Sequence, residues 1–157
     1  MTKIALFAGS FDPFTRGHEA VVEEALRLFD EVVIGVGDNV SKKRLLSVDE
    51  RYRLIEDLYA DNERVRVAKY STLTGDFARE VGATALVRGV RNTIDFEFER
   101  TIEATNRNLF PDLTTVLLVT PAEYMHISSS VVRELLAFGR SVDEFMPSKI
   151  KIENYLK

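Results

Sequence analysis

Residues 3–29 read KIALFAGSFDPFTRGHEAVVEEALRLF and combine a short apolar run, a loop and a segment with helical periodicity. The run 3–8 is apolar after its first residue, which is typical of a strand buried on both faces. From residue 18 onward, apolar side chains recur on one stripe of a helix. The loop 9–18 holds two glycines, a proline, an aspartate and one of the two histidines of the chain. A plain strand-to-helix connection needs far fewer special residues, so this loop is predicted to be a functional site.

The same alternation continues along the chain. Strand-like runs occupy residues 3–8, 31–37, 64–70, 84–89 and 114–120. Helical patterns occupy residues 18–29, 47–59, 75–82, 94–110 and 128–139, and an amphipathic segment follows at 148–157. Five strand–helix repeats predict an α/β protein with a doubly wound, five-stranded parallel sheet. The run 64–70 alternates polar and apolar residues and is predicted to be an edge strand, whereas the other four are predicted to be buried on both faces.

The composition limits what the protein can do. The 157 residues contain no low-complexity tract and are predicted to form one domain over residues 1–157. The chain has no cysteine, which excludes disulfides, a thiolate nucleophile and cysteine-based metal sites. A net charge of −4 argues against a partner bound by bulk positive charge, so no nucleic acid is expected. The N-terminal apolar run is too short for a signal peptide or a membrane span, and we expect a cytoplasmic protein with no membrane partner.

The unusual residues gather in the loops that follow the predicted strands. These loops are 9–18, 38–44, 71–77, 88–99 and 121–130. Parallel strands bring their carboxyl ends to one edge of a sheet, and ligands bind at that edge where the strand order reverses. The sequence therefore predicts one binding site built from five loops.

Two of these loops run into helix starts, where free backbone N–H groups and the helix dipole favour an anion. Gly17 and His18 open the first helix, and the serines 128–130, followed by Arg133, open the last. Both sets suit a phosphate cradle. Plainer interpretations stay open, because His18 shares a helical face with apolar residues and a serine run is most often an ordinary N-cap. The sequence also leaves the protonation state of His18 open.

Familiar catalytic patterns are absent from the sequence. It contains no GxxxxGK[ST] phosphate loop, no HExxH motif and no spacing typical of a serine nucleophile with its base. It does place two basic clusters in the predicted site, at residues 42–44 and at Arg88 with Arg91. This inventory fits attack by an already ionised phosphate on a nucleoside triphosphate, a reaction in which catalysis consists of alignment and stabilisation of charge on the α-phosphate.

The loop GSFDPFTRGH (9–18) resembles the first signature of the nucleotidyltransferase α/β-phosphodiesterase superfamily, and ISSSVVRE (127–134) is similar to the second, ISSxxxR. The segments SKK (41–43) and RGVRNTIDFEFE (88–99) narrow the resemblance to the bacterial phosphopantetheine adenylyltransferases. This resemblance implies a Rossmann-like nucleotidyltransferase fold. It also implies transfer of the adenylyl group of ATP to 4′-phosphopantetheine, giving 3′-dephospho-CoA and pyrophosphate, a step of coenzyme A biosynthesis.

The resemblance further implies roles for individual residues. His18 would be catalytic and stabilise the transition state, and 4′-phosphopantetheine would be bound by Ser10, Lys42, Thr74 and Arg88. ATP would be bound by Ser10, Phe11, His18, Gly89, Val90, Arg91, Glu99, Tyr124, Met125, His126, Ile127, Ser128, Ser129 and Ser130. The resemblance also implies Mg²⁺ as a cofactor and a homohexameric assembly. It assigns no side chain of this sequence as a ligand of the metal.

Two alternatives remain open on the sequence. Another nucleotidyltransferase, such as a nicotinamide-mononucleotide adenylyltransferase or a glycerol-phosphate cytidylyltransferase, would share both signatures, although the segment 88–99 weighs against either. A non-catalytic nucleotide-binding regulator on the same layered sheet is the second alternative, since a fold does not fix a function. That interpretation leaves His18 and Lys42 without a role.

Overall fold

The computed structural model describes residues 1–39 and 43–157. Its centre is a parallel sheet of five strands in the order β3-β2-β1-β4-β5. The strands are β1 (Ile4–Gly9), β2 (Glu31–Gly37), β3 (Val65–Tyr70), β4 (Ala85–Val90) and β5 (Thr114–Val119). The order reverses between β1 and β4, which pair through Ala5–Ala85, Leu6–Leu86 and Phe7–Val87. The predicted α/β class and doubly wound parallel sheet are confirmed.

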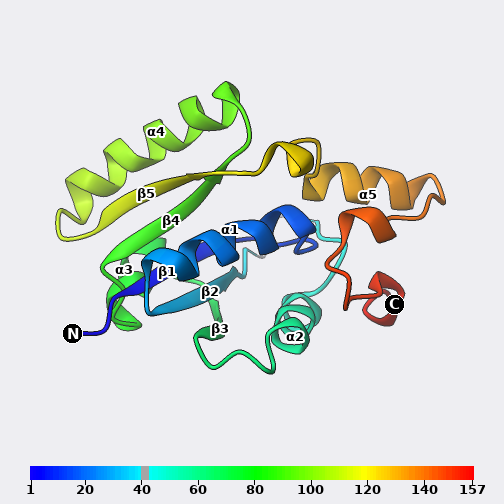
Figure 1. Ribbon diagram of the computed structural model, residues 1–157, viewed down its shortest axis with the longest axis horizontal. Helices are drawn as coiled ribbons and strands as arrows, with labels where there is room; N and C mark the ends of the chain where they lie inside the picture. Colours follow the sequence, from blue (N-terminus) through cyan, green and yellow to red (C-terminus); the bar gives the residue numbers. More distant parts are fainter. Residues whose placement is uncertain (40–42) are drawn as a thin grey trace.

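Helices cover both faces of this sheet (Figure 1). The helices are α1 (Arg16–Leu28), α2 (Val48–Leu58), α3 (Thr74–Glu80), α4 (Thr93–Leu109) and α5 (Ser129–Ala137). Ala5 and Phe7 of β1 pack into a core shared with α1, α2, α5 and the C-terminal segment. Leu6 and Ala8, which alternate with them, pack into a second core with α3. A β1 buried on both faces explains the continuous apolar run in the sequence.

Local side-chain chemistry sets the helix ends. Thr15 caps α1 and Ser47 caps α2, each accepting a hydrogen bond from a backbone N–H three residues later. Gly82 and Gly139 follow α3 and α5 with φ of 78° and 70°, the left-handed conformation that glycine adopts without a steric penalty. Within the described residues 1–39 and 43–157, the structure has no helix long and apolar enough to cross a membrane.

One sequence prediction is wrong, and one amphipathic segment differs from the helices that precede it. The run at 114–120 forms the second edge strand, β5, and its residues are half-buried or exposed rather than buried on both faces. The amphipathic segment 148–157 forms only one short 3₁₀ turn, η3 (Ile152–Asn154). Ile150 and Ile152 are both buried, and a helix would place residues two positions apart on nearly opposite sides.

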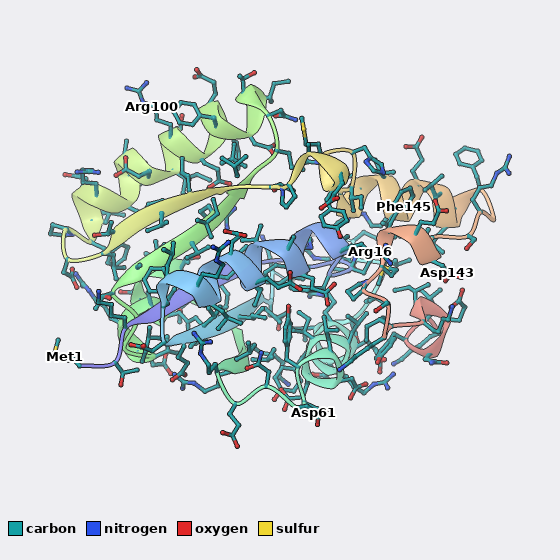
Figure 2. The ribbon with its side chains drawn as sticks, viewed as in Figure 1. Met1, Arg16, Asp61, Arg100, Asp143 and Phe145 are labelled. Carbon is teal, nitrogen blue, oxygen red and sulfur yellow. The ribbon has the colours of Figure 1, made fainter. Side chains whose placement is uncertain are left out.

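Helix α4 has an unusual burial pattern. Of its 17 residues, Glu99 alone is buried. Large apolar side chains of the same helix are exposed, with 77% of Ile94, 43% of Phe96 and 64% of Phe98 accessible. The helix lies beside β5 at the margin of the molecule, and Arg100 projects from it away from the sheet (Figures 1 and 2). Apolar packing against the sheet therefore contributes little to its placement.

Candidate active site

Three adjoining cavities surround the ends of β1 and β4, and all three are lined by Ala8 and Arg88. The first, here the polar cavity, has a volume of about 320 Å³ and lies between the loop after β1, the end of β4 and the start of α5. The second, the apolar cavity, measures about 400 Å³ and lies between α4 and the sheet. The third, the outer cavity, measures about 740 Å³ and lies beyond the ends of β2 and β3. The polar and outer cavities lie at the strand ends, where the sequence predicts a binding site, and the apolar cavity adjoins both.

The polar cavity brings together most of the residues that the resemblance assigns to ATP. Those in its lining are Ser10, Phe11, His18, Gly89, Arg91, Ile127, Ser128, Ser129 and Ser130. They come from three loops that are far apart in the sequence. The roles of these residues in binding a nucleotide stay predictions. The structure does bring the residues of the two signature motifs to one cavity, as a shared binding site requires.

His18 is fixed by the cap of α1. The backbone N–H of Thr15 donates to Nδ1 of His18 at 2.9 Å, while the backbone N–H of His18 donates to Oγ1 of Thr15 at 3.4 Å. Nδ1 is therefore an acceptor, which places the proton of a neutral ring on Nε2. His18 is both a capping residue, as the plainer interpretation of the sequence held, and a side chain that lines the polar cavity.

The surroundings of His18 keep its ring neutral. The rings of Phe7, Phe11 and Phe14 lie 5.0–6.1 Å from it, centroid to centroid. Burial in this cluster, followed by the charges of Arg88 and Arg91, lowers the pKa of His18 to about 3. Near neutral pH the imidazole therefore offers a neutral Nε2–H donor and no positive charge.

The three serines at the start of α5 make three different contacts. Ser128 caps the helix by accepting from the N–H of Val131 at 3.2 Å, and Ser129 donates to the carbonyl of Pro13 at 2.8 Å. Arg133 donates to Oγ of Ser130 at 3.1 Å. Only one serine serves as the ordinary cap, so the other two hydroxyls and the arginine remain at the cavity wall. This arrangement suits an anion at a helix N-terminus.

Two arginines at the end of β4 are each held by an acid of α4. Arg88 donates from Nε and Nη2 to the two carboxylate oxygens of Glu99 at 2.8 and 2.9 Å, and from Nη1 to the carbonyl of Ala8 at 2.6 Å. Arg91 donates from its backbone N–H and from Nε to Oδ2 of Asp95, both at 3.0 Å. Both pairs are of the strong, geometrically specific kind that arginine forms with carboxylates.

The apolar and outer cavities adjoin at Thr74. Tyr70, at the end of β3, shares a hydrogen bond of 3.0 Å between its hydroxyl and that of Thr74. Leu73 and Phe98 contribute apolar wall to the cavity between α4 and the sheet, whereas Arg44 and Arg88 add positive charge to the outer one. Together they form a space that suits a ligand with an extended, weakly polar arm and an anionic end.

Some predicted site residues lie elsewhere. Tyr124, Met125 and His126 lie on and just after the turn η1 (Ala122–Tyr124), beside the polar cavity but outside its lining. Glu99 lines the apolar cavity, and both of its oxygens bind Arg88. Val90 ends β4 without reaching a cavity lining. Lys42 lies outside the described residues.

Asp12 is a part of the site that was not predicted from the sequence. Its buried carboxylate accepts hydrogen bonds from the backbone N–H groups of Leu45 and Leu46, both at 2.8 Å. Asp12 therefore ties the loop after β1 to the segment before α2. An aspartate before a proline is usually interpreted as a turn residue, so no pattern in the sequence indicates this long-range contact.

Arg51 was missed as well. It lies in α2 with only 2% of its surface exposed and donates from Nη1 to the carbonyls of Ser10 and Gly37, at 2.6 and 2.9 Å. A third bond, from Nε, reaches the carbonyl of Leu46 at 3.3 Å. Arg51 thus holds the ends of β1 and β2 together. In the sequence it looks like a solvent-facing helix residue, because arginine is rarely buried.

Comparison with known proteins places the chain in a family. Residues 6–135 match the cytidylyltransferase-like family model. A phosphopantetheine adenylyltransferase of Porphyromonas gingivalis is 53% identical over 144 residues, which cover 92% of this chain and 94% of the relative. The chain belongs to the phosphopantetheine adenylyltransferase family. A family member from Phocaeicola vulgatus is 50% identical over 95% of this chain and 98% of its own, and one from Latilactobacillus sakei is 49% identical over 96% and 92%.

Solved structures confirm the fold. A bifunctional NMN adenylyltransferase/ADP ribose pyrophosphatase from Francisella tularensis superposes with a TM-score of 0.71 at 18% identity, over 93% of this chain. This chain spans only 45% of that bifunctional protein. A protein assigned as a nicotinate-nucleotide adenylyltransferase from Vibrio parahaemolyticus superposes with a TM-score of 0.67 at 23% identity, over 94% and 96% of the two chains. At these identities the likeness establishes the shared nucleotidyltransferase architecture alone.

Proposed function

We propose that this enzyme transfers the adenylyl group of ATP to 4′-phosphopantetheine, giving 3′-dephospho-CoA and pyrophosphate. Membership in the phosphopantetheine adenylyltransferase family supports the reaction. The observation that carries it in the structure is the position of Arg88, which lines the polar, apolar and outer cavities at once. A cation at this junction suits the point where two phosphate-bearing substrates meet.

The reaction needs alignment more than acid–base chemistry. A phosphate oxygen of the acceptor forms a new bond to the α-phosphorus of ATP, while the bond from that phosphorus to the bridging oxygen breaks and pyrophosphate leaves with the electron pair. The acceptor phosphate is already ionised near neutral pH, so no side chain has to remove a proton. Negative charge builds on the α-phosphate oxygens, and donors fixed in advance stabilise it.

In this scheme the neutral His18 donates from Nε2 to an α-phosphate oxygen. The cap contact through Nδ1 fixes the orientation of the ring. Because the pKa of His18 is low, the ring is neutral and donates through the proton that Nε2 already carries. Arg91, Arg133 and the hydroxyls at the start of α5 hold the triphosphate. The turn at residues 124–126, together with Gly89 and Val90, contributes to the nucleotide side of the site.

The acceptor occupies the other two cavities. Its pantetheine arm lies in the apolar cavity past Thr74, and its phosphate is held by Arg88 and Lys42, with Ser10 between the two substrates. The apolar lining of the second cavity supports this arrangement, because an arm with few charges gains from burial against apolar walls. Lys42 enters the scheme from its motif alone.

Mg²⁺ is proposed as the companion of ATP rather than as an ion held by the protein. In the part of the chain that the structure describes, no three His, Asp or Glu side chains come together as a metal site. Asp12 and Asp95 line the polar cavity, but their oxygens already accept hydrogen bonds. Mg²⁺ commonly keeps several waters and binds through substrate phosphates. We propose a cytoplasmic location for the enzyme. ATP would enter the site there with Mg²⁺ already bound to its phosphates.

The enzyme is further proposed to assemble as a homohexamer. The subunit number comes from the family resemblance. The exposed apolar side chains of α4, of which Ile94 is the most exposed, support an interface between copies. Exposed patches of this kind commonly mark interaction sites. Light scattering should give six times the mass of one chain, and Ile94→Glu should reduce it. A wild-type protein that is monomeric at micromolar concentration would contradict the proposal.

Acceptor choice tests the proposed reaction. With ATP and Mg²⁺, purified protein should release pyrophosphate and form a product with the mass of 3′-dephospho-CoA far faster with 4′-phosphopantetheine than with nicotinamide mononucleotide or glycerol phosphate. Comparable turnover of either competing acceptor would overturn the assignment.

A further inference from the structure

Residues 142–155, here the C-terminal segment, contact both loops that carry the signature motifs. The segment contains the turn η2 (Asp143–Phe145) as well as η3. Where it passes the start of α1, Arg16 and Phe145 lie in one region of the molecule (Figure 2). The segment is anchored in the core shared with α1, α2 and α5 by its buried residues, which are Val142, Met146, Ile150, Ile152 and Tyr155. It is therefore a fixed support beside the polar cavity.

The first contact is made by Arg16, the first residue of α1. Its Nε and Nη2 both donate to the carbonyl oxygen of Met146, at 3.1 and 2.9 Å. Met146 is fully buried, so this carbonyl is held in place. Arg16 directly precedes Gly17 and His18, which line the polar cavity. The two-point contact therefore anchors the helix turn that carries His18.

The second contact joins the segment to the loop before α5. The ring of Phe145 lies against the ring of His126, with centroids 5.7 Å apart and an angle of 73° between the planes. This edge-to-face geometry is favourable for aromatic pairs. His126 directly precedes Ile127, which is buried and lines the polar cavity. Phe145 thus supports the loop from outside the cavity, at the residue before the second signature.

We propose that Arg16 and Phe145 are positioning residues for ATP, through which the C-terminal segment sets the separation of the two signature loops. The inference rests on the proposed function. Arg16 acts through the first turn of α1 and His18, and Phe145 acts through His126. Neither Arg16 nor Phe145 lines the polar, apolar or outer cavity, so both act through other residues.

The two loops meet closely enough for their separation to matter. A Cβ atom at Gly17 would lie 3.8 Å from the carbonyl oxygen of Ile127, which is van der Waals contact. Ser129 ties the start of α5 to the carbonyl of Pro13 at 2.8 Å, whereas the C-terminal segment holds the loops at residues 16 and 126. Loops fixed at several points keep their donors in place before a ligand enters, and this preorganisation lowers the entropic cost of binding.

Separate measurements on the two substrates test the role. Arg16→Met keeps a long side chain but removes the donors. It should raise the KM and the calorimetric Kd for ATP about tenfold, and should also lower kcat, because His18 moves with the turn. Phe145→Leu keeps apolar bulk without the ring and should weaken ATP binding by about two- to tenfold. The Kd for 4′-phosphopantetheine should stay within about twofold in both variants, because its proposed cavities lie elsewhere.

Three further variants separate positioning from stability. Ile152→Val removes a methyl group from a fully buried residue of the same segment, so it should lower Tm and leave the Kd for ATP unchanged. Phe145→Tyr keeps the ring and should bind ATP like wild type. The double variant of Phe145→Leu with His126→Leu should bind ATP no more weakly than the weaker single variant, because both changes remove one contact.

The outcomes separate the inference from the function it rests on. A wild-type protein that binds ATP but does not use 4′-phosphopantetheine refutes the proposed function. An active wild type in which Arg16→Met and Phe145→Leu bind ATP normally overturns the positioning roles. So does an equal weakening of both substrates, in step with a fall in Tm that Ile152→Val reproduces. Phe145→Leu, at a half-buried position, decides the matter if Arg16→Met fails to fold.

Discussion

Replacing His18 by alanine tests whether this side chain acts in catalysis or only caps α1. The imidazole has two functions in the structure: Nδ1 closes the cap of α1, and Nε2–H is available to the polar cavity. Loss of one preorganised donor of this kind typically costs about 10²–10³ in kcat, or roughly 3–4 kcal/mol. Because the donor acts mainly as charge builds in the transition state, the Kd for ATP should change far less than kcat.

The cap contact predicts a separate loss of stability. Removing a capping interaction costs about 1 kcal/mol, which lowers Tm by roughly 2–4 °C in a chain of this length. His18→Gln is the matched control, because glutamine at this position is a usual partner in a capping box. This variant should recover most of the Tm while its kcat stays well below that of wild type.

Turnover, ATP affinity and Tm measured on both variants decide between the two functions of His18. If His18→Ala keeps its turnover within about threefold of wild type while its Tm falls, the side chain only caps the helix, and the transition-state role assigned to it is wrong.

Three further predictions follow from single features. Lys42→Ala should weaken 4′-phosphopantetheine binding by about 10- to 150-fold in calorimetry and change ATP binding much less; the reverse would mean that the two subsites are exchanged. The folded protein holds the pKa of His18 near 3, whereas the unfolded chain accepts a proton near 6.5. The free energy of unfolding of the protein should therefore fall as pH drops from about 6.5 toward 3, and His18 should contribute up to ~1.4 kcal/mol per pH unit to this fall. In urea titrations, His18→Gln should show a shallower fall. In Gly75→Ala a new Cβ would collide with the buried ring of Phe110, so Tm should fall by the equivalent of about 1–3 kcal/mol, and an unchanged Tm would show that the ring can move.

Much of the fold is predictable from the sequence, because the spacing of apolar side chains indicates which segments form strands and which form helices. The alternating run 64–70 correctly indicated an edge strand. The loop 9–18, predicted to be a functional site, lines the polar cavity. The apolar run that became β5 was misleading. An apolar run shows only that side chains avoid water, and does not show whether a strand lies in the middle of a sheet or at its edge.

The missing parts of the site depend on side-chain geometry between distant residues. Arg51 contacts carbonyls 14 and 41 residues away, and Asp12 contacts a segment 33 residues away. The pair of Arg88 and Glu99 is separated by eleven residues across a strand–helix corner, so no helical spacing reveals it. Only the pair of Arg91 and Asp95 has a spacing, i to i+4, that could have been noticed in the sequence.

Isotope exchange between pyrophosphate and ATP tests whether the acceptor phosphate attacks ATP itself. In a direct attack no protein group carries the adenylyl unit. Labelled pyrophosphate should therefore enter ATP only when 3′-dephospho-CoA is present, through reversal of the complete reaction. Exchange at a comparable rate with ATP and pyrophosphate alone would reveal an adenylyl-enzyme and contradict the account.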